Sequence, residues 1–458
     1  MAFDEMNSDS WDQAEQKAML AYELYENGSL ARAMEELDGA LKMNPDNASW
    51  HFNKALTLDA LERFDDANAE YEQALELNPD DPEILNSLAV NYTRTGRYDM
   101  AISIFEQIEK LEPEFEPAYC NRIITYTEMD DFDKAEQMFY LAQQINPNCP
   151  LCYYNIGNSL FSRREYKKAI WCWEKTLELE PTHPQINYRI AQGHWASGNH
   201  EAAKRFFLAQ LRSDPGDIEV ILDFGLFLLE TGDLESAKEK FNRIIELSPD
   251  FAPAIHYLGE IALNTGDIPR AIELFQEAIR KDYKISAAQY RLAQCALLTG
   301  DTAAAKEHLK KELDLEPEDA DVLLSMGSMF LQLNETDTAL NCFLQALDAD
   351  ENNAQAYHFL ALTAVLRKEF DNAMDFFESA LKINPESPDI LCDIAQLHLV
   401  MADTKAAYTC ITQARQLSGG KSEIVTLYRQ IWRRHFIRKI RDWSVETWKR
   451  MLSSSPQA

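Results

Sequence analysis

The chain has 458 residues, a formal net charge of -32, and 46% hydrophobic residues with only 15 glycines. Burial of that much apolar surface can offset the entropy of ordering the chain, so the composition excludes wholesale disorder. No segment approaches the roughly 18 consecutive apolar residues of a spanning helix, and the acidic N-terminus does not read as a secretory signal, so we expect a cytoplasmic protein.

The charge is unevenly distributed. Residues 420–458 contain nine Lys or Arg against three acidic residues, a net of +6, which leaves -38 for residues 1–419. The field of such an acidic body repels nucleic acid and favours neutral or basic protein segments. We therefore expect no nucleic-acid binding through the body of the chain.

Residues 1–13 form an acidic segment that precedes the periodic part of the sequence. Two interpretations of this segment remain open. Trp11 covers the exposed side of the first repeat, or the segment is disordered.

From residue 14 to residue 421 the sequence repeats every 34 residues. Prolines mark the period at Pro45, Pro79, Pro113, Pro147, Pro181, Pro215, Pro249, Pro317 and Pro385. An alanine lies twelve residues before every period mark: Ala33, Ala67, Ala101, Ala135, Ala169, Ala203, Ala237, Ala271, Ala305, Ala339, Ala373 and Ala407. Twelve alanines in twelve registers are not an accident of composition.

Each 34-residue unit contains two stretches with apolar residues at helical spacing, so each is predicted to be a helical hairpin. Six units have a glycine at the break between the stretches: Gly28, Gly96, Gly198, Gly232, Gly266 and Gly300. The alanine suits a close crossing of two helices, where a larger side chain would force the backbones apart. The proline cannot continue a helix and suits the turn into the next one.

This pattern resembles the tetratricopeptide repeat (TPR), which has a small residue at position 8, Ala at position 20, a large residue at position 24 and Pro at position 32. Position 8 is small in every repeat except at Ile123, and position 24 is large throughout. The resemblance implies an all-α solenoid of about twelve hairpins, with no room for a catalytic domain. The chain also lacks the glycine-rich phosphate-binding motifs, so we expect a protein that is not an enzyme and needs no cofactor.

The resemblance also implies a binding face, because positions 2, 5, 6, 9, 12 and 13 of the first helices line the concave groove in this family. In repeats 4 to 6 this register selects Asn121, Tyr154, Asn155, Asn158, Phe161, Tyr188, Arg189, Gln192 and Trp195. Amides can bond an extended peptide backbone and aromatic rings supply contact area, which predicts a peptide site. The alternative is that these side chains complete contacts between repeats.

Repeat 9 carries part of the same pattern at Tyr290, Arg291 and Gln294, and we consider it a second subsite. Position 5 is never Lys, unlike the carboxylate clamp of chaperone-binding members of the family. Recognition of acidic C-terminal tails is therefore not expected, and neutral or basic segments are the expected partners.

The sequence contains one C-x-x-C motif, Cys149-Pro150-Leu151-Cys152, at the turn into repeat 5. A redox or metal role is physically reasonable at a helix N-terminus. A zinc site needs four ligands, however, and no second C-x-x-C or H-x-x-x-H supplies the others. We therefore favour packing cysteines with no metal, and we expect all eight cysteines to be reduced thiols.

Residues 422–452 are predicted to form basic amphipathic capping helices, followed by a disordered tail at residues 453–458. Ile424, Leu427, Tyr428 and Ile431 are spaced to pack on repeat 12. Beyond them lies a basic surface that either caps the array or docks on an anionic surface: Arg433, Arg434, Arg438, Lys439 and Arg441.

The sequence thus predicts a non-enzymatic scaffold that binds peptide segments or partner proteins in its groove. The alternative is a self-associating assembly protein, a homo-oligomer that uses the basic C-terminal helix as its docking element.

Overall fold

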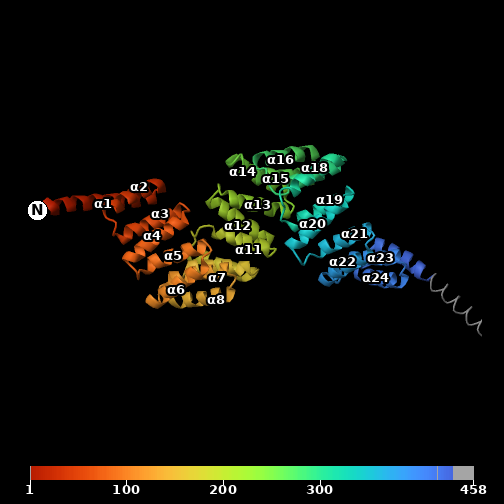
Figure 1. Cartoon of the computed structure of the whole chain (residues 1–458), viewed down its shortest axis with the longest axis horizontal. Coiled ribbons are helices and arrows are strands. Elements are labelled where there is room, and N and C mark those ends of the chain that lie inside the picture. The colour runs from red at the N-terminus through yellow and green to blue at the C-terminus, as the bar shows by residue number, and fades with distance from the viewer. Residues whose placement is uncertain (1, 420, 437–458) are drawn as a thin grey trace, which may run out of the picture. The chain divides into compact units, whose positions relative to one another are not determined.

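The structure, a computed structural model, describes residues 2–419 and 421–436, and the side chains of residues 13–419 and 421–436. Helices are the only regular elements in these residues, and no strand is present among them. The chain divides into two compact units, the first ending at Asp233 and the second beginning at Leu234. Figure 1 shows the helices of each unit in chain order.

The first unit consists of thirteen helices: α1 (Ala2–Glu26), α2 (Leu30–Met43), α3 (Ala48–Ala60), α4 (Phe64–Leu77), α5 (Pro82–Arg94), α6 (Tyr98–Leu111), α7 (Glu116–Glu128), α8 (Phe132–Ile145), α9 (Pro150–Ser162), α10 (Tyr166–Leu179), α11 (Ile186–Ala196), α12 (His200–Ser213) and α13 (Ile218–Glu230).

The described part of the second unit begins with eleven helices: α14 (Leu234–Leu247), α15 (Ala252–Asn264), α16 (Ile268–Lys281), α17 (Ala288–Thr299), α18 (Thr302–Leu313), α19 (Ala320–Gln332), α20 (Thr336–Ala349), α21 (Ala354–Leu366), α22 (Phe370–Ile383), α23 (Pro388–Val400) and α24 (Thr404–Leu417). A further helix occupies residues 422–436.

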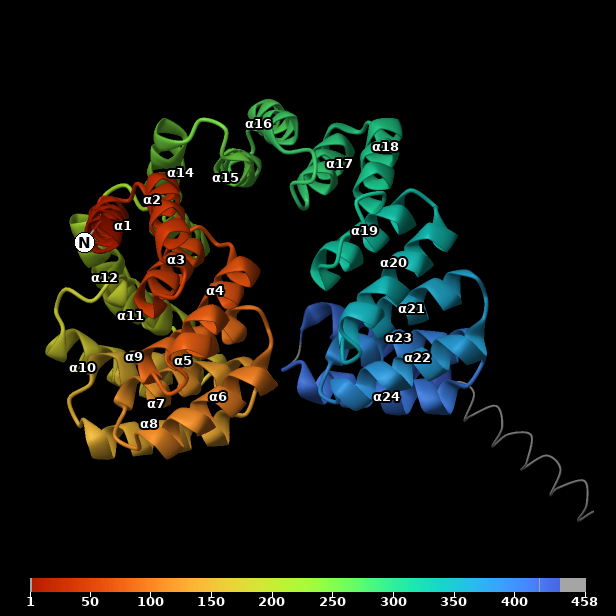
Figure 2. The ribbon, with the colours of Figure 1, turned by 60° about the vertical axis from the view of Figure 1, so that its left-hand side comes forward.

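Within each unit, consecutive helices pair into hairpins, such as α7 with α8 and α21 with α22 (Figure 2). The second helix of a hairpin also packs on the first helix of the next repeat, as α10 does on α11. First helices contact the first helices of neighbouring repeats, as α7 does with α9. The predicted fold, an α-solenoid of stacked hairpins held by nearest-neighbour interfaces, is confirmed.

The core of every repeat lies at the positions that mark the period. All twelve alanines at position 20 have 0% exposed surface, and the large residues at position 24 are buried in every repeat. In repeat 5, position 8 packs directly on position 24, since a Cβ atom added to Gly157 would lie 2.6 Å from Nε1 of Trp173. Gly259 and Gly327 likewise leave no space for a methyl group beside the rings of Phe275 and Phe343.

Position 15, at the turn inside each hairpin, has a positive φ in all twelve repeats. The six glycines at this position have φ values between 72° and 82°. The other six repeats adopt the same left-handed conformation with other residues: Glu62, Asp130, Arg164, Asn334, Lys368 and Ala402. The turn geometry is therefore set by the hairpin, and glycine is only the residue that adopts it with least strain.

The ends of the chain differ in how far the structure describes them. The backbone of residues 2–13 continues α1 toward the N-terminus, whereas the side chain of Trp11 lies outside the described side chains. Ile424, Leu427, Tyr428 and Ile431 pack on α23 and α24, which is the packing predicted for the start of the capping segment, residues 422–452. Residues 437–458 lie outside the described residues. None of the described helices is long and apolar enough to cross a membrane.

Candidate functional site

The first helices of successive repeats are connected by polar contacts between residues 35 positions apart. Arg189 Nε donates to the Tyr154 hydroxyl at 3.4 Å, and the Tyr188 hydroxyl donates to Asp223 Oδ2 at 2.7 Å. Trp195 Nε1 donates to Glu230 Oε2 at 2.7 Å. Position 5 therefore meets position 6 of the following repeat, and position 12 meets position 13. These are positions of the predicted groove, so one face carries a continuous ladder across α9, α11 and α13.

Six residues of this face line a pocket of about 380 Å³: Phe161, Gln192, Trp195, Ala196, Asp223 and Glu230. Phe161 comes from α9, Trp195 from α11, and the two carboxylates from α13. The pocket combines aromatic walls with negative charge. An arrangement of this kind suits a cationic side chain, which gains attraction from the ring faces as well as from the carboxylates.

Both carboxylates, Asp223 and Glu230, accept hydrogen bonds within the ladder. Asp223 Oδ2 accepts hydrogen bonds from the Tyr188 hydroxyl and from Gln192 Nε2, the latter at 3.0 Å. Among the described residues, no Lys, Arg or His side chain forms a salt bridge with Asp223 or Glu230. Burial, together with the bond to Asp223, raises the pKa of Tyr188 and keeps its proton as the donor.

The predicted amide residues divide between the groove and the interior. Asn155 is 3% exposed, and its Nδ2 donates to the Cys120 carbonyl oxygen at 2.9 Å. Asn158 Oδ1 accepts from Trp173 Nε1 at 3.1 Å, and Asn121 Nδ2 donates to Asn86 Oδ1 at 3.1 Å. These amides make contacts within the stack, as the alternative interpretation of the sequence stated. Of the predicted set, Phe161, Gln192 and Trp195 line the pocket.

The acidic residues Asp223 and Glu230 were missed at the sequence level, although they occupy positions 6 and 13 of repeat 7. The predicted groove residues lie in repeats 4 to 6 and in repeat 9, and repeat 7 contributes none of them. The same register continued by one repeat would have identified both carboxylates. The signal was therefore in the sequence, one repeat beyond the segment considered.

The motif of repeat 9 lies in a different environment. Arg291 forms an ion pair with Glu260 through Nε, and its Nη1 donates to Gln294 Oε1 at 2.9 Å. The guanidinium also lies 5.0 Å from the centre of the Tyr290 ring. Unlike Arg189, which bonds only neutral groups, Arg291 has a carboxylate partner from the preceding repeat. The second subsite therefore differs from the first in its charge.

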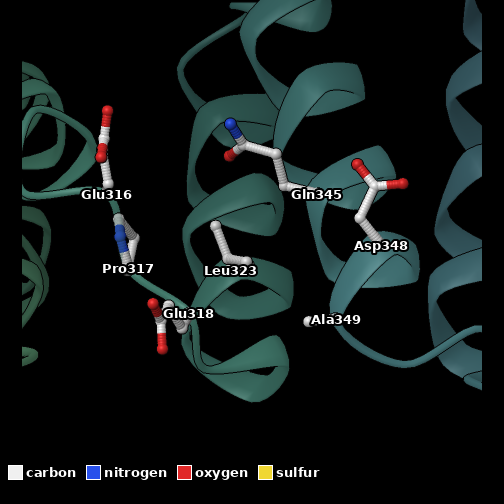
Figure 3. Close-up of a pocket in the computed structure, with 7 residues that line it drawn as sticks. All are labelled: Glu316, Pro317, Glu318, Leu323, Gln345, Asp348 and Ala349. Atoms are coloured by element: carbon white, nitrogen blue, oxygen red, sulfur yellow. The ribbon is translucent and has the colours of Figure 1, made fainter.

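Another pocket in the second unit, of about 570 Å³, lies between the loop before α19 and helix α20 (Figure 3). Glu316, Glu318 and Asp348 contribute carboxylates to its lining, but no aromatic side chain does. In Figure 3 the carboxylates of Glu316 and Asp348 do not converge on a common point. This pocket lacks the combination of ring faces and charge found between α9, α11 and α13.

The basic surface predicted for the C-terminal helix is described only in part. Arg433 and Arg434 are exposed, whereas Arg438, Lys439 and Arg441 lie outside the described residues. Trp432 and Phe436 are exposed beside them, with their rings stacked at 5.1 Å between centroids.

The prediction that all cysteines are reduced was wrong for one pair. Cys120 and Cys152 form a disulfide, and the remaining six cysteines are free. The expectation failed because it considered spacing along the chain, whereas α7 and α9 bring cysteines of two successive repeats together. Cys149 of the C-x-x-C motif lies beside this pair, with its Sγ atom 3.7 Å from that of Cys120.

Comparison with solved structures found chains that match this one along most of its length. A chain from the crystal structure of the APC/C hetero-tetramer Cut9-Hcn1 is 14% identical, with 92% of this chain and 96% of that chain covered and a TM-score of 0.44. Yeast Tom70 is 15% identical, with 96% of this chain and 99% of that chain covered and a TM-score of 0.46. No curated protein sequence matches this chain.

Comparison with protein families found tetratricopeptide repeats in both units. Residues 15–183 match the N-terminal TPR repeats region of Psidin. Residues 218–251 match one tetratricopeptide repeat family, and residues 256–320 and 324–388 match another. Together with the period and the stacked hairpins, these matches show that the chain is a tetratricopeptide repeat protein.

Proposed function

We propose that this TPR scaffold binds an extended protein segment along α9, α11 and α13, and that a basic side chain of the segment occupies the pocket between Trp195, Asp223 and Glu230. The observation that carries the proposal is a pair of carboxylates without a basic partner beside two aromatic rings. Burying part of a guanidinium or ammonium group there satisfies the carboxylates and uses the ring faces. Repeat arrays present such faces for extended partners.

The charge of the chain supports this assignment. Residues 1–419 carry a net charge of -38, which attracts cationic segments and accelerates their encounter with the groove. Arg189 lies nearby, but its bonds to Tyr154 and Gln192 leave the carboxylates of α13 without a salt-bridge partner. No catalytic role follows from this arrangement, which positions groups for recognition.

The test uses a random dodecapeptide library displayed on phage and the purified full-length chain. We expect selected peptides to share an Arg or Lys, and a synthetic copy to bind in a fluorescence anisotropy titration. Trp195→Ala should weaken binding of that peptide by about 2 kcal/mol, roughly thirtyfold in Kd, because a central aromatic contact is lost. Asp223→Asn and Glu230→Gln should each weaken binding by about 1 kcal/mol, since the ion pair that each carboxylate forms with the peptide is partly solvated.

The two amide variants are conservative, because each retains an acceptor oxygen for the Tyr188 hydroxyl or for Trp195 Nε1. Asp99→Asn, which removes an exposed acidic side chain on α6, is the matched control and should leave affinity unchanged. Selected peptides without basic residues, or peptides whose affinity is the same for Asp223→Asn and Asp99→Asn, would contradict the proposal.

Self-association through the C-terminal helix is a second candidate. The described end of this helix exposes two aromatic side chains, Trp432 and Phe436, beside Arg433 and Arg434. The acidic repeats of another copy would bind these aromatic and cationic groups. Light scattering at increasing salt concentration tests it, because screening should dissociate such a complex. A monomer at every salt concentration would exclude this candidate.

A further inference from the structure

The start of helix α9 places two sulfur atoms at one point. Cys149 is the N-cap residue of α9, and its Sγ atom accepts a hydrogen bond from the backbone N–H of Cys152 at 3.2 Å. The N–H groups at a helix N-terminus favour negative charge on an atom in this position. The C-x-x-C spacing thus directs both cysteines toward the preceding repeat.

Helix α7 of the preceding repeat supplies two further donors at the same point. Glu116 and Cys120 lie one helical turn apart on α7, which contacts α9. Glu116 Oε1 lies 3.1 Å from Cys120 Sγ and 3.3 Å from Cys152 Sγ. One ligand atom from each of the four side chains lies within 4.8 Å of all the others, and the three cysteines are buried.

The separation of the Cys120 and Cys149 sulfur atoms matches an edge of a tetrahedral zinc site. With Zn–S bonds of about 2.3 Å, two sulfur ligands of one tetrahedral ion lie about 3.8 Å apart. Cys120 Sγ and Cys149 Sγ are 3.7 Å apart. Three sulfur atoms with one carboxylate oxygen are also a donor set that zinc accepts. The sequence motif alone lacked two ligands, and the neighbouring repeat provides them.

The cluster needs an explanation beyond packing, because it buries a thiol against a carboxylate. A divalent cation satisfies such a group of donors, because coordination deprotonates a thiol and gives a carboxylate a positively charged partner at the same time.

We propose that, in the reduced protein, Glu116, Cys120, Cys149 and Cys152 bind one zinc ion. The disulfide between Cys120 and Cys152 is the oxidised form of the same cluster. A phosphine reductant cleaves the S–S bond by giving two electrons; its phosphorus takes an oxygen atom from water, and two protons complete the two thiols. Binding of zinc then releases three protons, one from each thiol.

The site would join repeat 4 to repeat 5 next to the proposed binding face. Asn155, one turn after Cys152 on α9, donates its amide to the carbonyl oxygen of Cys120. A metal bound by α7 and α9 fixes the same interface that this amide spans. Because the metal binds only the folded arrangement, it should raise the thermal unfolding temperature of the chain.

The experiment is a titration of the full-length chain with Co²⁺ under tris(2-carboxyethyl)phosphine, followed by displacement with Zn²⁺. We expect a single equivalent of Co²⁺ to give the intense ligand-field absorption of a tetrahedral site and a sulfur-to-cobalt band of three thiolates. Zn²⁺ should abolish both signals. Cys149→Ser and Glu116→Gln should each weaken Co²⁺ binding by more than about tenfold, as expected for loss of a ligand.

Cys172→Ser is the matched control, because Cys172 is a buried free cysteine on α10 outside the cluster. It should bind Co²⁺ like the natural chain, and circular dichroism checks the fold of each variant. The proposal is overturned if the reduced natural chain shows no tetrahedral cobalt spectrum. It is equally overturned if folded Cys149→Ser retains the full sulfur-to-cobalt band, or if the phosphine leaves Cys120 and Cys152 joined.

Discussion

Repeats 6 and 9 carry the same Tyr-Arg-x-x-Gln motif in the same register, beginning at Tyr188 and Tyr290. Both motifs also follow an unusual helix start, since α11 and α17 begin after residues with positive φ, 56° at Gln185 and 62° at Ala287. The two regions are thus alike in sequence and in backbone. They differ in what the neighbouring repeats contribute.

In the first unit, the repeat after the motif contributes carboxylates and the repeat before it contributes neutral groups, so Asp223 has no basic partner. In the second unit, the preceding repeat contributes Glu260, which pairs with Arg291. The arginine of the same motif bonds neutral groups in one place and a carboxylate in the other. The environment of the motif therefore depends on the adjacent repeats, and the motif within one repeat does not define it.

The largest change in stability is expected at the start of α17 in repeat 9. Glu312 is buried and accepts hydrogen bonds from the backbone N–H groups of Ala287 and Tyr290, both at 2.9 Å, whereas repeat 6 has Gln210 at this register position. Glu312→Leu leaves two backbone donors without a partner and should lower the local stability of α17 by about 3 kcal/mol. Amide hydrogen exchange across α17 measures this loss.

Glu312→Gln is the sharper half of this test, because it gives repeat 9 the residue of repeat 6. Burial raises the pKa of Glu312, so glutamine removes a desolvation penalty while it keeps one acceptor oxygen. We expect a loss of only about 1 kcal/mol. Equal losses for the leucine and glutamine variants would show that the acceptor contributes nothing to the helix start.

The second prediction concerns the arginines of the two motifs. Arg291→Met leaves Glu260, whose side chain is 10% exposed, without its cationic partner and should destabilise repeat 9 by about 2 kcal/mol, less than for a fully buried pair. Arg189→Met removes bonds to two neutral groups and should cost under about 1 kcal/mol. Hydrogen exchange of α11 and α17 measures both changes. Similar losses in the two repeats would mean that the difference in charge has no energetic consequence.

The third prediction is a pH dependence that belongs to the second unit. Position 5 of repeat 8 is His256, where repeat 5 has Tyr154. Burial, with a smaller effect of Arg291, lowers the pKa of His256 to about 4. Between about pH 6.5 and pH 4 the unfolded chain therefore takes up a proton that the folded chain does not, and stability falls as the pH falls.

His256→Gln removes this dependence, so the stability difference between the natural chain and the variant should change by on the order of 2 kcal/mol from pH 7 to pH 4. Burial raises the pKa of Glu260, which acts in the opposite direction but is present in both proteins. Hydrogen exchange of α15 over this pH range gives the difference. Parallel pH profiles would contradict the assignment of a neutral buried imidazole.

The repeating core could be predicted from the sequence because its packing recurs with the period. Ala169 is buried where two helices cross, and Trp173 fills the space that Gly157 leaves open, as the register required. The same contact recurs between Gly259 and Phe275 and between Gly327 and Phe343. A periodic sequence therefore contains enough information for the fold.

The functional groups follow contacts between repeats, which the period alone does not specify. Asn155 has a suitable residue type and register for the groove, yet the carbonyl oxygen of Cys120 binds its amide in the interior. Cys120 and Cys152 occupy different positions of their repeats and meet only because α7 lies against α9. Predicting either of these contacts requires the offset between neighbouring first helices. That offset is a property of the packed structure.

The smallest predicted effect tests whether the shared helix start is strained. Gln185 holds a left-handed conformation that costs a residue with a Cβ atom about 1–2 kcal/mol, whereas glycine loses about 0.5–1 kcal/mol through its greater freedom in the unfolded chain. Gln185→Gly should therefore stabilise α11 by about 0.5–1 kcal/mol relative to Gln185→Ala, which keeps the Cβ atom. Hydrogen exchange of α11 in the two variants measures this difference. If α11 is equally stable in the Gln185→Ala and Gln185→Gly variants, the turn before α11 is not strained. The left-handed helix start shared by repeats 6 and 9 would then follow from their side-chain contacts.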